Sequence, residues 1–166
     1  ANRVDRRTGA TAKYPSLLAG LLFDANGDRM TPSHARKAGK HYRYYVSASL
    51  VRGTGSKEAR RPQTKGRRVP AGDIERLVEA ELIRLMGDAP ALHAMLERHV
   101  CNAIDRHALI ASAQSLAAGW SGMTAPAKRQ ILTALIERIV IRPDAIELCI
   151  RPDRLAGILK GEGQSG

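Results

Sequence analysis

A tight-turn signal near the N-terminus constrains this chain more than any other feature. Residues 24–28 read Asp-Ala-Asn-Gly-Asp, and an Asn-Gly pair favours a two-residue hairpin turn because both residues tolerate positive φ. Residues 29–35 and 41–50 flank a second turn at 36–40, and the later run is rich in the strand-forming residues Tyr and Val. We therefore expect a three-stranded meander, or two linked hairpins, over residues 16–50.

The segments around these strands are less regular. Residues 16–23 form a short apolar run that fits either a buried strand or one helical turn. Residues 1–15 show no apolar periodicity, which predicts an extended basic arm or a disordered end. Residues 51–68 combine three glycines, a proline and seven Lys or Arg, which predicts a flexible basic loop.

From Val69 onward the apolar residues recur at helical spacing. Pro70 suits the first helical turn and Gly87 ends the pattern, so residues 71–86 are predicted to form an amphipathic helix. Its apolar face is Ile74, Leu77, Val78, Leu82 and Leu85.

Asp88 suits the cap of a second helix. This helix covers residues 92–118, with Leu92, Leu96, Val100 and Ile104 four apart, and allows a break near 101–102. The two helices together predict an antiparallel helical hairpin.

The last third of the chain changes period again. Thr124 suits the cap of a third helix at 125–138, and alternation around Pro143-Asp144 predicts a β-hairpin at about 138–151. A short closing helix at 152–159 follows. The predicted fold is therefore α+β, with an antiparallel β-ribbon platform, a helical hairpin, a third helix and a C-terminal β-hairpin. We expect a basic arm at 1–15, a β domain with its basic loop at 16–68, the helical hairpin at 69–123, the core-completing part at 124–159 and a disordered tail at 160–166.

Positive charge is concentrated in the first part of the chain. The formal net charge is +11, and residues 1–68 hold 16 Lys or Arg against 4 Asp or Glu, whereas residues 69–166 hold 11 against 12. Such a segment predicts a polyanionic partner, for which nucleic acid is the first choice. An anionic membrane surface fits less well because the basic segment lacks a basic amphipathic helix. No apolar run reaches the roughly 18–20 residues that span a bilayer.

The sequence offers little for catalysis. Neither a G-x-S-x-G elbow nor an S-x-x-K pair is present. His34 and His41 flank the basic turn without a suitably placed acid to orient them. The tyrosines at 42, 44 and 45 invite comparison with DNA-cleaving nucleophiles, but the spacing of the nearby arginines does not support a phosphate clamp. We therefore expect no catalytic residue in this chain.

Metal-ligating residues are also poorly spaced. Cys101 and Cys149 lie far apart and outside any C-x-x-C pair, so neither a disulfide framework nor a zinc site is expected. The five histidines lack ligand spacing with a cysteine. These observations predict no cofactor and a reduced, cytoplasmic location.

The remaining signal is basic residues interleaved with aromatics on a small sheet. Such hairpins can enter a groove of double-stranded DNA while their cations neutralise phosphates. The predicted DNA-binding residues are Arg29, Thr31, Ser33, His34, Arg36, Lys37, Lys40, Arg43, Arg60, Arg61, Lys65, Arg67 and Arg68.

Several runs of residues resemble one family. They are Leu18-Ala19-Gly20-Leu21-Leu22, Gly27 followed by Met30, and Lys37, Gly39 and Tyr42-Arg43-Tyr44-Tyr45. Together they look like the zinc-β-ribbon region of the large serine site-specific recombinases, the resolvase/invertase-like enzymes of phages and mobile elements. Residues 69–75 resemble that family's entry into a long helix, and residues 131–150 its return from a helical, coiled-coil-like excursion. The resemblance covers residues 14–159.

This sequence departs from the family pattern in two ways. The family commonly has a Cys-x-x-Cys-Gly knuckle where this chain has Phe23-Asp24-Ala25-Asn26-Gly27, and a second cysteine pair is missing after residue 46. The resemblance therefore implies a ribbon without zinc, folded by the tight turn and by added core packing. The family's serine nucleophile belongs to an N-terminal resolvase domain that nothing here matches.

The resemblance implies a C-terminal module that binds attachment-site DNA and aids synapsis in DNA recombination. Its expected partners are double-stranded DNA and, through the helices, itself or other recombinase subunits, with no membrane. The alternative is a helical protein–protein interaction module, used in oligomerisation, with the basic segment serving as a linker.

Overall fold

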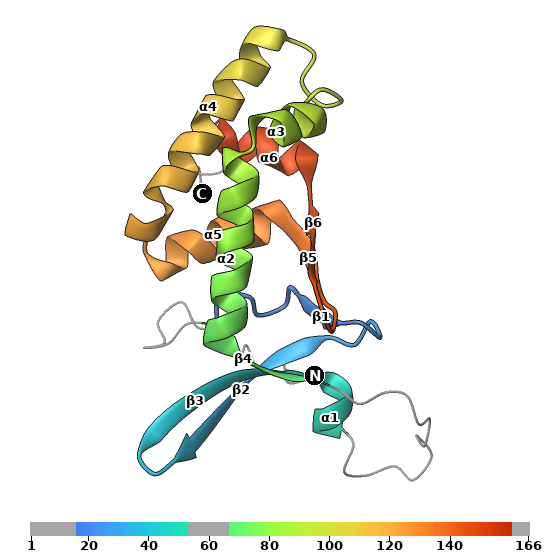
Figure 1. Cartoon of the computed structure of the whole chain (residues 1–166), viewed down its shortest axis with the longest axis vertical. Coiled ribbons are helices and arrows are strands. Elements are labelled where there is room, and N and C mark those ends of the chain that lie inside the picture. Colours follow the sequence, from blue (N-terminus) through green and yellow to red (C-terminus); the bar gives the residue numbers. More distant parts are fainter. Residues whose placement is uncertain (1–15, 53–66, 161–166) are drawn as a thin grey trace, which may run out of the picture.

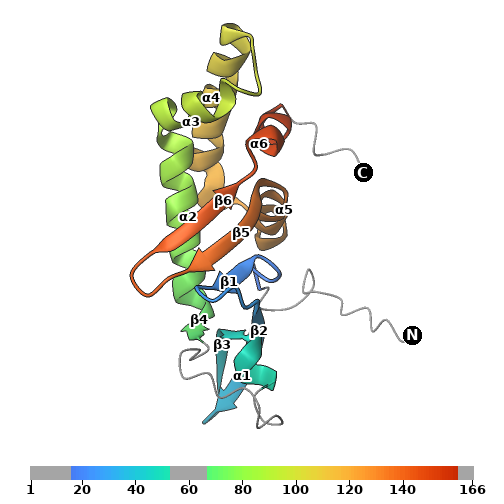
Figure 2. The same ribbon diagram turned by 90° about the vertical axis from the view of Figure 1, so that its right-hand side faces the viewer.

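The computed structural model describes residues 16–52 and 67–160 and confirms the predicted α+β fold. Two three-stranded sheets and a set of helices are arranged along one long axis (Figure 1). Figure 2 shows the sheets one above the other, with helix α2 rising beside the upper one. The predicted arm at 1–15 and most of the predicted loop and tail lie outside the described residues.

The basic sheet consists of β2 (Met30–Lys37), β3 (Lys40–Ser47) and β4 (Arg68–Pro70), paired antiparallel in that order. The two predicted strands at 29–35 and 41–50 are therefore present. The second ends early because residues 48–52 form the short helix α1 (Ala48–Arg52). The carboxylate of Asp28 accepts a hydrogen bond from the Ser49 N–H at 3.1 Å, which favours the helical turn at this point.

The apolar sheet corrects the predicted meander. β1 (Leu22–Asp24) pairs in parallel with β5 (Ile136–Ile141), which pairs antiparallel with β6 (Ile146–Ile150). A turn forms at 24–28 as predicted, and the Gly27 N–H donates to the Asp24 carbonyl at 3.0 Å. Its central residues are therefore Ala25 and Asn26, and of the predicted Asn-Gly pair only Gly27 has positive φ. Beyond it, an isolated bridge pairs Phe23 of β1 with Arg29, the residue before β2. The predicted pairing was wrong for a physical reason, since Leu22 is fully buried and its strand partner is the equally buried Ile139.

Three helices form the predicted helical hairpin. They are α2 (Ala71–Gly87), α3 (Ala89–Leu96) and α4 (Ala103–Gly119). Asp88 caps α3 as predicted, by accepting from the Ala91 N–H at 3.1 Å. The predicted break also forms, where the Asn102 side chain caps α4 and Arg106 donates to the Val100 carbonyl at 2.6 Å. Because of the break, α4 is free to pack along α2 (Figure 1).

Two predicted apolar contacts of these helices are wrong. Leu77 is 57% exposed because the buried stripe of α2 runs from Ala71 through Ile74 and Val78 to Met86. Ile104 is 78% exposed, because the break resets the helical phase and places Leu109 and Ala113 against the core instead. Leu92, Leu96 and Val100 are buried as their spacing predicts.

The last helices close the core. Trp120 lies in a 3-10 turn, η1 (Trp120–Gly122), and is followed by α5 (Ala125–Leu135) and α6 (Pro152–Leu159). α5 ends three residues earlier than predicted because Ile136 already belongs to β5. The Trp120 indole N–H donates to Glu79 at 2.7 Å, and the Lys128 ammonium lies 2.8 Å from the same oxygen. This contact fixes α5 to α2. In residues 16–52 and 67–160 we find no helix with the length and apolarity needed to cross a membrane.

Candidate nucleic-acid interface

The β2–β3 hairpin, here called the ribbon (residues 30–47), carries most of the predicted DNA-binding residues. Its turn is Ala38-Gly39, with φ of 50° and 75°. Positive φ at both central residues suits a two-residue hairpin because its twist matches the flanking strands. The turn sets the register in which Lys37 faces Lys40, so two cations lie at the tip.

The register assigns every ribbon side chain to one of two faces. In a paired strand, residues two apart share a face and directly paired residues lie on the same face. The outer face is Thr31, Ser33, Ala35 and Lys37 of β2, Lys40, Tyr42, Tyr44 and Val46 of β3, and Arg68 of β4. The inner face is Met30, Pro32, His34 and Arg36 of β2, His41, Arg43, Tyr45 and Ser47 of β3, and Val69 of β4.

The predicted DNA-binding residues are divided between these faces. Thr31, Ser33, Lys37, Lys40 and Arg68 belong to the outer face, and His34, Arg36 and Arg43 to the inner face. Arg29 precedes β2, with its guanidinium carbon 5.6 Å from the centre of the Phe23 ring. Arg67 precedes β4 and donates to the Arg142 carbonyl at 3.2 Å. Arg60, Arg61 and Lys65 lie outside the described residues.

Charge on the ribbon is of one sign. Residues 29–57 contain no Asp or Glu. Most of the ribbon beyond its base is exposed, including both tip lysines and the inner-face Arg36. The Arg36 Nε–H donates to His41 Nε2 at 2.9 Å. A hairpin of this kind offers cations and hydroxyl groups to a polyanion without an acidic side chain to repel it.

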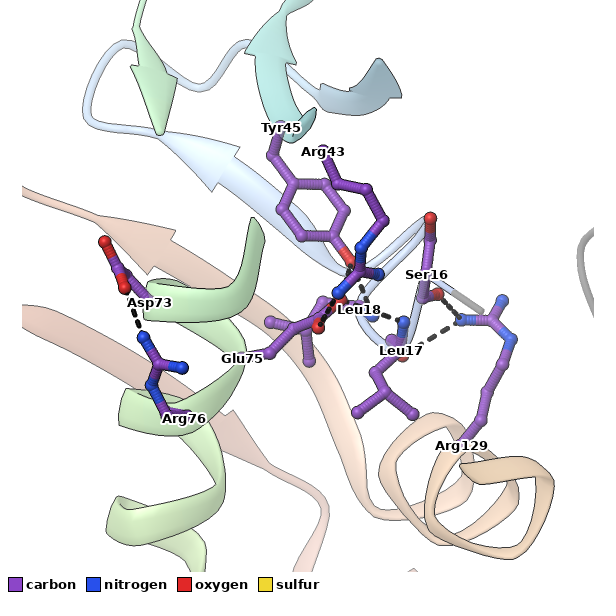
Figure 3. Close-up of polar contacts among 9 residues, drawn as sticks. All are labelled: Ser16, Leu17, Leu18, Arg43, Tyr45, Asp73, Glu75, Arg76 and Arg129. Carbon is purple, nitrogen blue, oxygen red and sulfur yellow. Dashed lines mark hydrogen bonds and ion pairs between the residues drawn. The ribbon is translucent and has the colours of Figure 1, made fainter. Parts of the chain in front are cut away.

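A buried carboxylate anchors the inner face of the ribbon to α2. Glu75 is 6% exposed and accepts hydrogen bonds from the Tyr45 hydroxyl at 2.8 Å and from the Leu17 N–H at 3.2 Å. The Arg43 guanidinium lies 3.0 Å from its other oxygen. Figure 3 shows the side chains of Tyr45 and Arg43 pointing from β3 toward Glu75. We call these three residues the Glu75 anchor.

The anchor changes the acidity of its tyrosine. Burial raises the pKa of Tyr45, and the neighbouring Glu75 carboxylate raises it further. The hydroxyl therefore stays protonated and donates to Glu75, while it accepts from the Leu18 N–H at 3.0 Å. Arg43 is thus engaged inside the protein, with 22% of its side chain exposed.

A second carboxylate organises the turn at residues 24–28. Asp24 is 2% exposed. One of its oxygens accepts from the backbone N–H groups of Asn26 and Asp28, at 2.9 and 3.0 Å. The other accepts from the Ser47 hydroxyl at 2.7 Å, and Ser47 in turn accepts from the Arg67 N–H at 2.8 Å. Asp24 therefore ties β1 to the base of the ribbon and to the start of β4.

An arginine from α5 completes the base. The Arg129 guanidinium donates to the carbonyls of Ser16, Leu17 and Ala19 at 3.0 to 3.2 Å. Figure 3 shows the contacts with Ser16 and Leu17. These carbonyls belong to a turn that has no regular helix or strand to satisfy them. Arg129 therefore holds this turn beside the Glu75 anchor.

Glu75, Asp24 and Arg129 were not predicted to act in this way. Asp24 was assigned only to the turn, and Glu75 only to the N-terminal end of its helix. One signal for Glu75 does exist, because it lies four residues after Ala71 and three before Val78 in the buried stripe of α2. An acid in an apolar stripe, in a chain rich in arginine, indicates a buried partner.

The described part of the chain shows no gathering of three or more His, Cys, Asp or Glu side chains that could hold a metal ion. What the ribbon offers chemically is hydrogen bonding and positive charge.

No known protein family and no curated protein matches the chain. Two solved structures are similar to it. One comes from work on the sequence requirements of the Listeria innocua prophage attP site, at 17% identity and a TM-score of 0.45, over 82% of this chain and 43% of that one. The other is the crystal structure of an LSR–DNA complex, at 18% identity and a TM-score of 0.46, over 82% of this chain and 51% of that one. This chain thus spans about half the length of each.

Proposed function

We propose that this chain is the DNA-binding module of a serine site-specific recombinase. In this role the ribbon binds attachment-site DNA, and the helices help to bring recombinase subunits together in synapsis. The strand-cleaving chemistry then belongs to a resolvase domain elsewhere in the parent enzyme. The family assignment is supported by the sequence resemblance over residues 14–159.

The single observation that carries DNA binding is the ribbon itself. It projects from the base of the molecule, it carries cations at its tip and on both faces, and residues 29–57 hold no acid. The Glu75 anchor and Asp24 hold only its base, so the distal half is available to a partner. Cations on a fixed hairpin suit a duplex because each phosphate contact releases condensed counterions.

The test is a titration of the full chain against a fluorescent duplex of about 30 base pairs, with KCl varied from about 50 to 300 mM. We expect log K to fall with log salt by about 0.9 for each phosphate contacted, and by at least about 2.5 in total. Charge reversal at Arg36, Lys37 and Lys40 should weaken binding to every sequence. Absence of binding at the lowest salt would contradict the proposal and favour the protein–protein interaction module.

Recognition of a particular site needs a second experiment. Selection from a random duplex library, carried out with the full chain at moderate salt, should recover a shared sequence. Recovery of unrelated sequences would restrict the role to sequence-independent binding.

A further inference from the structure

The two faces of the ribbon differ in what surrounds them. The inner face turns toward α2, where Tyr45 and Arg43 are bonded to Glu75. Figure 1 shows α2 rising from the base of the ribbon, and Figure 3 shows the inner-face side chains of Tyr45 and Arg43 directed at it. A duplex that approached the base of this face would meet the helix, and a phosphate near Arg43 would compete with a carboxylate already bonded to it.

The outer face carries a different set of groups. Its polar members are the hydroxyls of Thr31, Ser33, Tyr42 and Tyr44, together with three cations at its two ends. None of its residues is acidic. Tyr42 is 40% exposed. Hydroxyl groups can bond to phosphates or to base edges, and small apolar groups can contact bases. On the inner face, by contrast, the hydroxyls of Tyr45 and Ser47 already donate to carboxylates inside the protein.

One outer-face cation is held in place. The guanidinium carbon of Arg68 lies 3.9 Å from the centre of the Tyr44 ring. Stacking of this kind fixes the plane of a guanidinium while its N–H edges stay available for two parallel hydrogen bonds. Arg68 is exposed, and within residues 16–52 and 67–160 no carboxylate lies within ion-pair distance of it. A preorganised guanidinium suits a phosphate or the edge of a guanine.

We propose that the outer face of the ribbon is the surface that meets DNA, with Arg68 on Tyr44 as its anchor and the hydroxyls of Ser33 and Tyr42 beside it. This inference rests on the proposed function and refines it. Arg43 serves the Glu75 anchor and makes no direct contact. His34 and Arg36 add to the positive field of the ribbon but face away from the duplex.

The direct test is photo-crosslinking from both faces. The amino acid p-benzoylphenylalanine replaces Tyr42 in one full-length variant and His34 in another, at similar distances from the tip but on opposite faces. Each variant is irradiated with a labelled duplex of mixed sequence at low salt. We expect several-fold more crosslinked DNA from position 42. Equal or greater yield from position 34, or bound duplex that crosslinks at neither position, would overturn the inference.

A matched pair of substitutions supplies an independent measurement. Arg68→Gln and Arg36→Gln remove the same charge from exposed positions on opposite faces. We expect Arg68→Gln to lower the salt slope by about 0.9, the value for one phosphate contact, and Arg36→Gln to leave it within error. Thermal melting of both variants should match the unmodified chain. Equal losses of slope would count against the inference.

The two proposals fail in different ways. If the unmodified chain binds no duplex at low salt, DNA binding itself is wrong. If it binds with a steep salt slope but the inner-face variants carry the losses, the ribbon binds DNA and only the choice of face is wrong.

Discussion

The two sheets of this protein are built from opposite kinds of residue. In the apolar sheet, Leu22, Ile136, Ile139 and Ile141 are at most 4% exposed and face the common core. The basic sheet buries Met30, Tyr45, Val46 and Ser47 near its base and leaves the rest of the ribbon exposed. Burial of apolar area therefore stabilises the first sheet, whereas hydrogen bonds to two carboxylates hold the second.

The comparison shows how a small fold can present a charged element. A ribbon of like charges repels itself and buries little, so it gains little stability of its own. Here Glu75 and Asp24 attach it at one end, and the apolar sheet and helices provide the stability. The following substitutions test this division, beginning with the largest expected effect on the free energy of unfolding.

Ile139→Ala should be the most damaging change. Ile139 is fully buried at the centre of the apolar sheet, between its partners Leu22 and Leu148. Truncation of a buried isoleucine costs about 3 kcal/mol, counting lost transfer energy and the cavity left behind. Urea denaturation followed by circular dichroism measures this loss in the free energy of unfolding. The half-buried Ile146→Ala is the control and should cost about 1 kcal/mol. Equal costs would mean that the apolar sheet is not the stable part.

Glu75→Ala should cost about 2–3 kcal/mol, because it removes the buried carboxylate that accepts from the Tyr45 hydroxyl and the Leu17 N–H and pairs with the Arg43 guanidinium. Glu81→Ala removes a partly exposed acid from the same helix, which forms an ion pair with Arg84, and should change stability by about 0.5 kcal/mol or less. The same denaturation experiment compares the two. A small effect at Glu75 would show that the ribbon is attached by packing instead.

Tyr45→Phe should cost about 1–2 kcal/mol and change the response to alkaline pH. The raised pKa of Tyr45 means that the folded state keeps a proton that the unfolded state loses above the ordinary tyrosine value of 10.0. This contribution to stability is therefore complete below pH 10 and declines as pH rises further. Denaturation is measured at a series of pH values from neutral to alkaline. The slope of the free energy of unfolding against pH should be smaller in the variant by the equivalent of about one proton. Parallel curves for the two proteins would contradict the assignment.

Lys37→Gln combined with Lys40→Gln should leave stability within about 0.5 kcal/mol, because both side chains are exposed at the tip. The salt slope of DNA binding should fall by up to about 1.8, the sum for two phosphate contacts. Anisotropy titrations and melting curves on the same preparation measure both quantities. If the double variant lost stability but kept its salt slope, the tip lysines would serve stability and not DNA binding, which is the opposite of the role assigned to the basic sheet.

Local structure was largely predictable from the sequence. The turn within residues 24–28, the caps at Asp88 and Thr124 and the ribbon strands all depend on neighbouring residues, and they formed where expected. The centre of that turn is Ala25-Asn26 and not the predicted Asn26-Gly27. The β1–β5 pairing joins Leu22 to Ile139 in parallel, and nothing in the local pattern of either strand specifies a partner so far along the chain. The break before Ile104 was predicted, but the change in helical phase that it causes was not, and that change leaves Ile104 exposed.

The candidate site was predictable in composition but not in arrangement. The basic residues of the ribbon were identified from charge and alternation, and their role as DNA contacts stays a prediction. Their faces depend on the register that the Ala38-Gly39 turn sets. The pairing of Arg43 with Glu75 joins residues 32 apart, and sequence alone does not reveal which arginine a buried acid selects.

The pairing of β1 with β5 and the contact of Arg129 with residues 16–19 also bear on how the chain folds during synthesis. The ribbon is synthesised well before β5, since Ile139 follows Leu22 by 117 residues. At about 5–20 residues per second, this delay is roughly 6–24 seconds. Throughout it, the nascent ribbon has its full charge but lacks the strand and the arginine that hold its base. A polypeptide released before Arg129 would keep the ribbon sequence and lose this attachment.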